Sequence, residues 1–173
     1  PNTLLEGLRT HPVQSSAEMQ KILAQLQPSA DALSIAAAVS DVRLIGGSHK
    51  QKRSKAQFLT SLNKDLEEVP DLLEEMVLRK KEGQILLGFT ALTGNDQEIQ
   101  KAAASKRLKK GCDLLFANPI DRPGHGFETN TNGGWLIGED GTALELPVRS
   151  KLGLAHQLLD ELLKLLPSIS EQA

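Results

Sequence analysis

The sequence is poor in cysteine and in aromatic residues. It contains one cysteine, Cys112, so no internal disulfide bond can form, and a reducing, cytoplasmic location fits best. Aromatic side chains make up 3% of the residues and tyrosine is absent, which argues against a surface on which nucleic acid bases stack. The net charge of -2 also lacks the positive field of a general nucleic acid binder. We therefore expect no nucleic acid partner.

Long apolar runs are missing as well. No run reaches the roughly 18 residues that a membrane-spanning helix needs, so we expect no contact with a membrane. The 173 residues are 39% hydrophobic and 24% charged, which is ordinary for a globular fold. This length matches one domain, so we predict a single domain over residues 1–167 and a frayed tail over residues 168–173.

Helical and extended patterns alternate along the chain. Ser15 precedes apolar residues at three- and four-residue spacing, which predicts an N-capped helix that ends at Pro28. The run over 32–39 is short and almost wholly apolar, which is typical of a strand buried on both faces. Other elements are predicted from the same signals: helices over 70–83, 99–110 and 152–166, and strands over 84–89 and 112–117.

The order of these elements determines the fold class. The strands over 84–89 and 112–117 are separated by one helix, which makes a βαβ unit with a parallel sheet. Residues 135–137 and 143–148 flank the turn 139–142, which predicts an antiparallel hairpin at the sheet edge. The sequence thus predicts an α/β fold, a Rossmann-like three-layer fold with a mainly parallel sheet and a C-terminal antiparallel hairpin.

Candidate binding residues follow the predicted strands. Open parallel sheets bind ligands beyond the carboxyl ends of their strands, and three such ends lie at Asp41, Phe89 and Asn118. Basic residues are concentrated nearby, over 50–53 and 106–110. Positive charge beside such a pocket suits a phosphorylated anion. A basic last helical turn also complements the helix dipole, however, and loop lysines are equally often mere surface charge.

Some residues allow two interpretations. Asp41 could hold a metal-bound phosphate or a ribose, or simply cap the following turn, and Asn118 has the same two interpretations. Cys112 fits a small core side chain better than a nucleophile, because no histidine is near it in the sequence. The sequence contains neither a glycine-rich dinucleotide fingerprint, nor a Walker phosphate loop, nor a nucleophile elbow.

Taken together, several short segments resemble a known ligase family. They run in order from about Ser15 to about Leu163. The family is phosphopantothenoylcysteine synthetase, the ligase half of the bifunctional bacterial coenzyme A biosynthesis flavoprotein. The segments that carry the resemblance are residues 36–41, 50–53, 69–72, 88–89, 106–113, 117–118 and 126–132.

The resemblance implies a two-step ligation. CTP would activate the carboxylate of 4'-phosphopantothenate as an acyl-cytidylate, with release of pyrophosphate, and cysteine would then displace the nucleotide to form an amide. Magnesium would bind through the substrate phosphates, and Lys50 would be the catalytic residue that closes over them. The implied CTP-binding residues are Ala36, Ala37, Asp41, Lys50, Val69, Pro70, Phe89, Lys106 and Lys110.

The resemblance also implies partners for the chain and an incomplete ligase domain. The family domain opens with a glycine-rich segment that has no counterpart here, so the chain would be an N-terminally incomplete nucleotide-binding ligase domain. Activity would require the upstream segment or the decarboxylase domain of a parent chain, with FMN only if that domain is present. A homodimer is also implied. The family usually has Asn at Val69, an acidic or amide side chain at Leu92 and Lys at Arg53, and the change at Val69 affects base selection, leaving CTP or ATP open.

A second hypothesis stays open on the residues alone. The chain could be a non-catalytic α/β module whose closing helix and edge hairpin serve dimerisation, or a module that only binds a nucleotide. A dehydrogenase-like dinucleotide fold is disfavoured because the fingerprint glycines are absent from these residues. Affinity for CTP separates the ligase from the dimerisation module.

Overall fold

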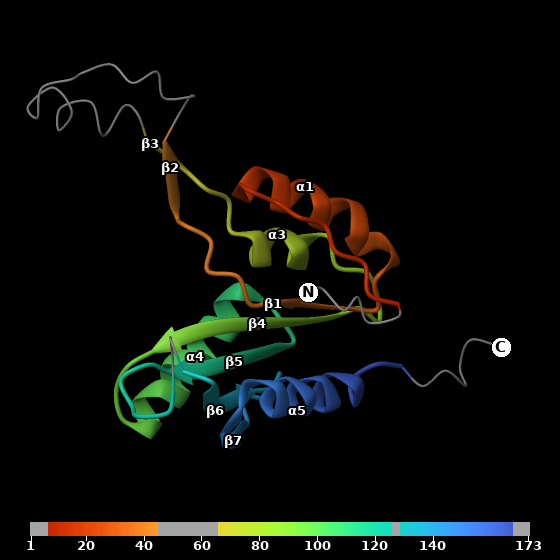
Figure 1. The fold of residues 1–173 in the computed structure, drawn as a ribbon. Helices are drawn as coiled ribbons and strands as arrows, with labels where there is room; N and C mark the ends of the chain where they lie inside the picture. The colour runs from red at the N-terminus through yellow and green to blue at the C-terminus, as the bar shows by residue number, and fades with distance from the viewer. Residues whose placement is uncertain (1–6, 45–65, 126–128, 168–173) are drawn as a thin grey trace, which may run out of the picture. The chain divides into compact units, whose positions relative to one another are not determined.

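A computed structural model of the chain describes residues 7–44, 66–125 and 129–167 (Figure 1). Lys50, the rest of the basic loop and the tail over 168–173 lie outside the described residues. The chain divides into two compact units, one comprising residues 1–25 and 38–71 and the other residues 26–37 and 72–173. The single domain over 1–167 stays a prediction.

The first unit contains most of helix α1 (Ser16–Leu26) and a small antiparallel sheet of β2 (Val42–Leu44) and β3 (Leu66–Glu68). Ser15 caps α1, since its Oγ accepts a hydrogen bond from the Glu18 amide at 3.2 Å. The predicted helix start is therefore confirmed. The strands β2 and β3 were not predicted, because three-residue strands carry too little pattern to be seen in the sequence.

The second unit is built on a five-stranded mixed sheet in the order β1-β4-β5-β6-β7. The first three strands in this order are parallel, whereas β6 and β7 form an antiparallel hairpin at the edge. The α/β class and the C-terminal hairpin are thus confirmed. The strands are β1 (Ala32–Ile35), β4 (Ile85–Leu92), β5 (Leu114–Pro119), β6 (Thr131–Ile137) and β7 (Ala143–Ser150).

Helices cover both faces of this sheet. Leu87 and Gly88 point to opposite faces because side chains alternate along a strand. Leu87 belongs to the core cluster under α5 (Lys151–Leu163), which lies beside β6 and β7 in Figure 1. Leu73 of α3 (Leu72–Leu78) lies over Gly88, where a Cβ would come within 2.6 Å of its Cδ2. The helix α4 (Asp96–Lys110) contacts β5 and β6, and α5 buries three leucines: Leu154, Leu158 and Leu162.

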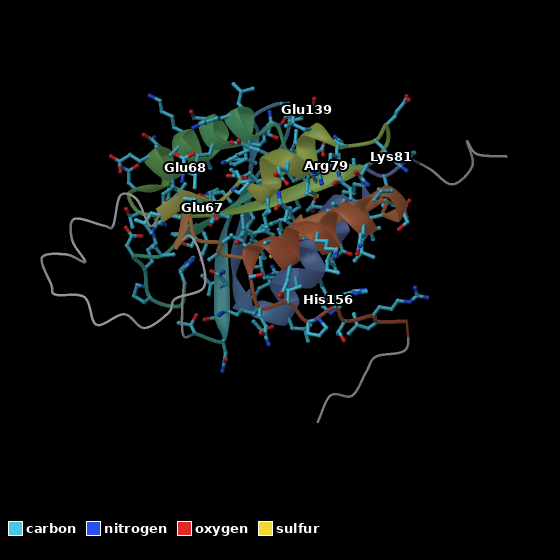
Figure 2. All side chains as sticks on the ribbon, turned by 90° about the horizontal axis from the view of Figure 1, so that it is seen from above. Glu67, Glu68, Arg79, Lys81, Glu139 and His156 are labelled. Atoms are coloured by element: carbon cyan, nitrogen blue, oxygen red, sulfur yellow. The ribbon has the colours of Figure 1, made fainter. Side chains whose placement is uncertain are left out.

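Several predicted boundaries require correction. The strand predicted over 32–39 ends at Ile35, and Ala36 and Ala37 are exposed and lie in no helix or strand. Its predicted burial on both faces was wrong, because only Ile35 is buried and Ser34 is exposed. The helix predicted over 70–83 spans only α3, and Figure 2 shows Arg79 and Lys81 just beyond its end. β6 begins at Thr131, four residues before the predicted start at Trp135.

The helices of the described residues are short. The longest, α4, has 15 residues, and it ends as predicted at Gly111, which has a left-handed conformation with a φ of 72°. None of the helices in this part of the chain is long and apolar enough to cross a bilayer.

Candidate functional site

The carboxyl ends of β4 and β5 form the candidate site of the second unit. The two strands pair in parallel, with Thr90 opposite Ala117 and Ala91 opposite Asn118. The loops that follow the two strands therefore start at the same edge of the sheet. This is the edge at which open parallel sheets bind their ligands.

Phe89 and Asn118 lie on the face of the sheet that α5 covers. The Phe89 ring packs edge to face against Phe116 with 5.7 Å between the ring centroids, and it is only partly buried. Asn118 follows Phe116 by two positions and therefore shares its face. The Oδ1 atom of Asn118 is buried and has no hydrogen-bond partner in the described structure. Burying an acceptor without a partner costs free energy, and a hydrogen-bond donor of a ligand would recover it.

Lys106 of α4 approaches the opposite face of β4. Its Nζ atom donates a hydrogen bond to the Thr90 Oγ1 atom at 3.0 Å. Thr90 is next to Phe89 in the strand, so their side chains point to different faces. The Lys106 side chain is exposed, and an ammonium group has three donors, so it can bind an anion while it holds Thr90.

Lys110 contacts a different element. Its Nζ atom lies 2.9 Å from the Glu74 Oε1 atom in the first turn of α3. Lys106 and Lys110, both predicted to bind CTP, thus have unlike surroundings: a neutral hydroxyl beside Lys106 and a carboxylate beside Lys110. The carboxylate offsets the charge of Lys110, so Lys106 is the stronger candidate for binding phosphate.

At the N-terminus of α4, side chains of this chain accept hydrogen bonds from the backbone amides that a phosphate would otherwise bind. Asn95 and Glu98 form a capping box, with their side chains accepting from each other's amides at 3.0 and 2.9 Å. The Asp121 carboxylate accepts from the Gly94 amide at 2.9 Å, and this bond lowers the pKa of Asp121. Asp96 adds a further negative charge in the first turn. A phosphate would be repelled here, although helix N-termini bind phosphate in many nucleotide-binding folds.

Arg122 ties the two loops at this edge together. Its Nη2 atom donates to the Gly94 carbonyl at 2.9 Å, and its Nη1 atom lies 2.7 Å from the Asp96 carboxylate. The guanidinium also lies 5.3 Å from the centre of the Trp135 ring, a cation-π distance. Arg122 was not predicted from the sequence. The available signal was the Asp121-Arg122 pair that closely follows Asn118 in a turn-rich stretch.

Three of the predicted residues lie in the described part of the first unit. The Val69 amide donates to the Asp41 carbonyl at 2.9 Å, so the structure brings these two residues together, with Pro70 next to them. The turn after Asp41 is closed by Ser40, whose Oγ atom donates to the Val42 carbonyl at 2.8 Å. In the second unit, Ala36 and Ala37 directly follow β1.

Cys112 is a core residue, as expected. Its side chain is 1% exposed, and burial raises the pKa of its thiol. Among the residues that the structure describes, no group of three or more His, Cys, Asp and Glu side chains could hold a metal ion.

Cys112 should therefore react slowly with iodoacetamide. We expect alkylation of the folded chain at about pH 8 to be at least tenfold slower than that of free cysteine, because the buried thiol stays protonated. The raised pKa also favours the folded state below the ordinary thiol pKa, and this stability is lost as the pH rises through the raised value. Mass spectrometry over time measures the rate, and labelling as fast as in urea would contradict the prediction.

Comparisons with known proteins agree with the resemblance in the sequence. The family model described as DNA/pantothenate metabolism flavoprotein C-terminal domain matches residues 2–166. The coenzyme A biosynthesis bifunctional protein CoaBC of Bacillus subtilis (strain 168) is 33% identical over 163 residues, covering 94% of this chain and 38% of that protein. The Mycobacterium tuberculosis (strain ATCC 25618 / H37Rv) protein of the same name is 31% identical over 179 residues, covering 95% and 40%. The chain thus spans about two fifths of the length of these relatives.

Solved structures support the fold. The crystal structure of the C-terminal domain of CoaBC matches with a TM-score of 0.65 and 26% identity, over 93% of this chain and 70% of that one. The DNA/pantothenate metabolism flavoprotein of Streptococcus pneumoniae matches with a TM-score of 0.68, over 93% and 73%, and its 15% identity supports the fold alone. Because the family model covers nearly the whole sequence, this chain belongs to the DNA/pantothenate metabolism flavoprotein C-terminal domain family, the phosphopantothenoylcysteine synthetase part of CoaBC.

Proposed function

We propose that the chain provides the nucleotide-binding part of a phosphopantothenate-cysteine ligase in coenzyme A biosynthesis. Its family implies the use of CTP. In the first step a carboxylate oxygen of 4'-phosphopantothenate attacks the α-phosphorus of CTP, and pyrophosphate leaves. In the second step the amine of cysteine attacks the acyl carbon of the acyl-cytidylate, so that the amide forms and CMP leaves.

The observation that carries this proposal is the position of Lys106 in a chain with this family membership. Its ammonium lies at the carboxyl half of β4, 3.0 Å from Thr90, and is exposed to solvent. A triphosphate and an attacking carboxylate repel each other, so a fixed positive charge is needed to bring them together. Magnesium, bound through the phosphate oxygens, would neutralise more of that charge.

Other residues have narrower proposed roles. Asn118 presents a buried acceptor without a partner, which suits a hydroxyl or amine donor of the ligand. Phe89, which is only partly buried, has its aromatic ring beside this edge. The roles of Ala36, Ala37, Asp41, Val69, Pro70 and Lys110 stay predictions, as does that of Lys50 as the catalytic residue. The homodimer, the upstream partner segment, the conditional FMN and the cytoplasmic location stay predictions as well.

Substitution of Lys106 tests the proposed site. We expect Lys106→Met to weaken the binding of CTP with magnesium by roughly tenfold, because a charge-assisted hydrogen bond to phosphate is lost. Isothermal titration calorimetry of the complete chain measures this change. Lys101→Met is the matched control, since it removes the same charge from an exposed position on a different side of α4. Equal affinity of the wild type and Lys106→Met, or no binding by either, would remove the site.

The dimerisation module is the second candidate, and one observation favours it. Three leucines of α5 are exposed by 70%, 51% and 60%: Leu152, Leu159 and Leu163. Their helical spacing places them along one side of the helix, together with His156, which is labelled in Figure 2. Such a stripe suits association of copies of the chain. The titration separates the candidates, since this module would assemble without affinity for CTP.

A further inference from the structure

We propose that Thr90 is a positioning residue for Lys106. The Thr90 hydroxyl accepts a hydrogen bond from the Lys106 ammonium at 3.0 Å and so holds it at the carboxyl half of β4. The inference rests on the proposed function, because it assigns Thr90 the task of orienting a phosphate-binding ammonium. The resemblance on which the other site residues rest does not include Thr90.

The structure gives Thr90 a rigid place from which to act. Thr90 is paired with Ala117 of β5, and two residues earlier, at Gly88, β4 is also paired with β1, so the backbone next to Thr90 is held by two ladders. Threonine is branched at Cβ, which restricts its first side-chain torsion and fixes the direction of the hydroxyl. Lys106, in contrast, has a flexible four-carbon stem on an exposed helix surface. Anchoring its end to β4 lowers the conformational entropy that nucleotide binding would otherwise cost.

The partners of the basic residues at the end of α4 differ, and this difference selects Lys106. Arg107 is only 9% exposed and donates to two carbonyl groups of the chain. Lys110 is paired with the Glu74 carboxylate. Lys106 is held by a neutral hydroxyl, which orients the ammonium without cancelling its charge and leaves donors for an anion. A carboxylate at position 90 would orient the ammonium but compete with phosphate for it.

The hydroxyl can be removed with little change of shape. We expect Thr90→Val to weaken the binding of CTP with magnesium roughly fivefold, and Thr90→Ser, which keeps the hydroxyl, to retain most of the affinity. In a Lys106→Met background the valine substitution should have no further effect, because the group that Thr90 orients is gone. Thr93→Val is the matched control, since Thr93 is exposed in the loop after β4.

Calorimetry on these variants is combined with NMR of the Lys106 side chain without nucleotide. The side-chain resonance should shift in Thr90→Val and stay in place in Thr90→Ser and Thr93→Val. The positioning role is overturned if Thr90→Val binds CTP as the wild type does, if serine fails to restore affinity, or if the loss persists in the Lys106→Met background. Absence of CTP binding by the wild type would instead overturn the proposed function, so the two failures are distinguishable.

Discussion

Replacement of Gly134 by alanine is expected to lower the free energy of unfolding by about 3 kcal/mol or more. A Cβ at this position in β6 would lie 2.1 Å from the Ala117 carbonyl oxygen and 3.1 Å from the Pro119 Cδ atom. Both contacts are to β5, and neither a backbone carbonyl nor a proline ring can rotate away. The φ of 156° also falls where side chains rarely fit. The sheet must therefore open locally to admit one methyl group.

Gly134→Ala should also disturb the candidate site. Ala117 and Pro119 flank Asn118, so a displaced β5 would move the unpartnered Oδ1 atom. Gly141→Ala is the matched control, because Gly141 has a φ of 80° and a Cβ added there would meet nothing within 4 Å. Gly141→Ala should lower the free energy of unfolding by about 1 kcal/mol, through backbone strain alone. Urea denaturation followed by circular dichroism measures both variants, and equal losses would show that the contact with β5 is harmless.

Short-range signals in the sequence were sufficient to predict much of the second unit. The helix α4 is bounded by an Asn95 capping box and by Gly111, both of which act through neighbours in the sequence. The hairpin turn likewise depends on nearby residues, since Asp140 accepts from the Thr142 amide and hydroxyl. The extent of β1 could not be obtained in this way. The apolar run over 32–39 does not reveal where pairing stops, and β1 pairs with β4 only as far as Ile35, opposite Gly88.

The candidate site was predictable only in part, for a related reason. Phe89 and Lys106 were predicted from a strand end, a basic segment and the resemblance, whereas Thr90 and Arg122 make contacts across 16 and 28 positions of the chain. Such contacts depend on how α4 and the loops pack on the sheet, which no periodicity encodes. The basic segment 106–110 shows the limit most clearly. Its sequence fits either a phosphate-binding group or a solvated helix cap, yet Arg107 within it points into the protein.

Arg107→Met is expected to lower the free energy of unfolding by about 2 to 3 kcal/mol. The guanidinium donates to the Cys112 carbonyl at 2.8 Å and to the Glu139 carbonyl at 3.0 Å, and Glu139, at the turn between β6 and β7, is labelled in Figure 2. Arg107 thus joins the end of α4 to the start of β5 and to the hairpin. Methionine fills a similar volume but leaves both carbonyl groups without this donor.

Two further substitutions separate the role of the hydrogen bonds from that of the positive charge. Lys109→Met removes the same charge from an exposed site on α4 and should change the unfolding free energy by no more than about 0.5 kcal/mol. Arg107→Lys keeps the charge, but a compact ammonium lacks the forked geometry that reaches two carbonyl groups, so it should restore only part of the stability. Thermal and urea unfolding measure all three variants. Full restoration by lysine would mean that the charge, rather than the pair of hydrogen bonds, is what the fold requires at this position.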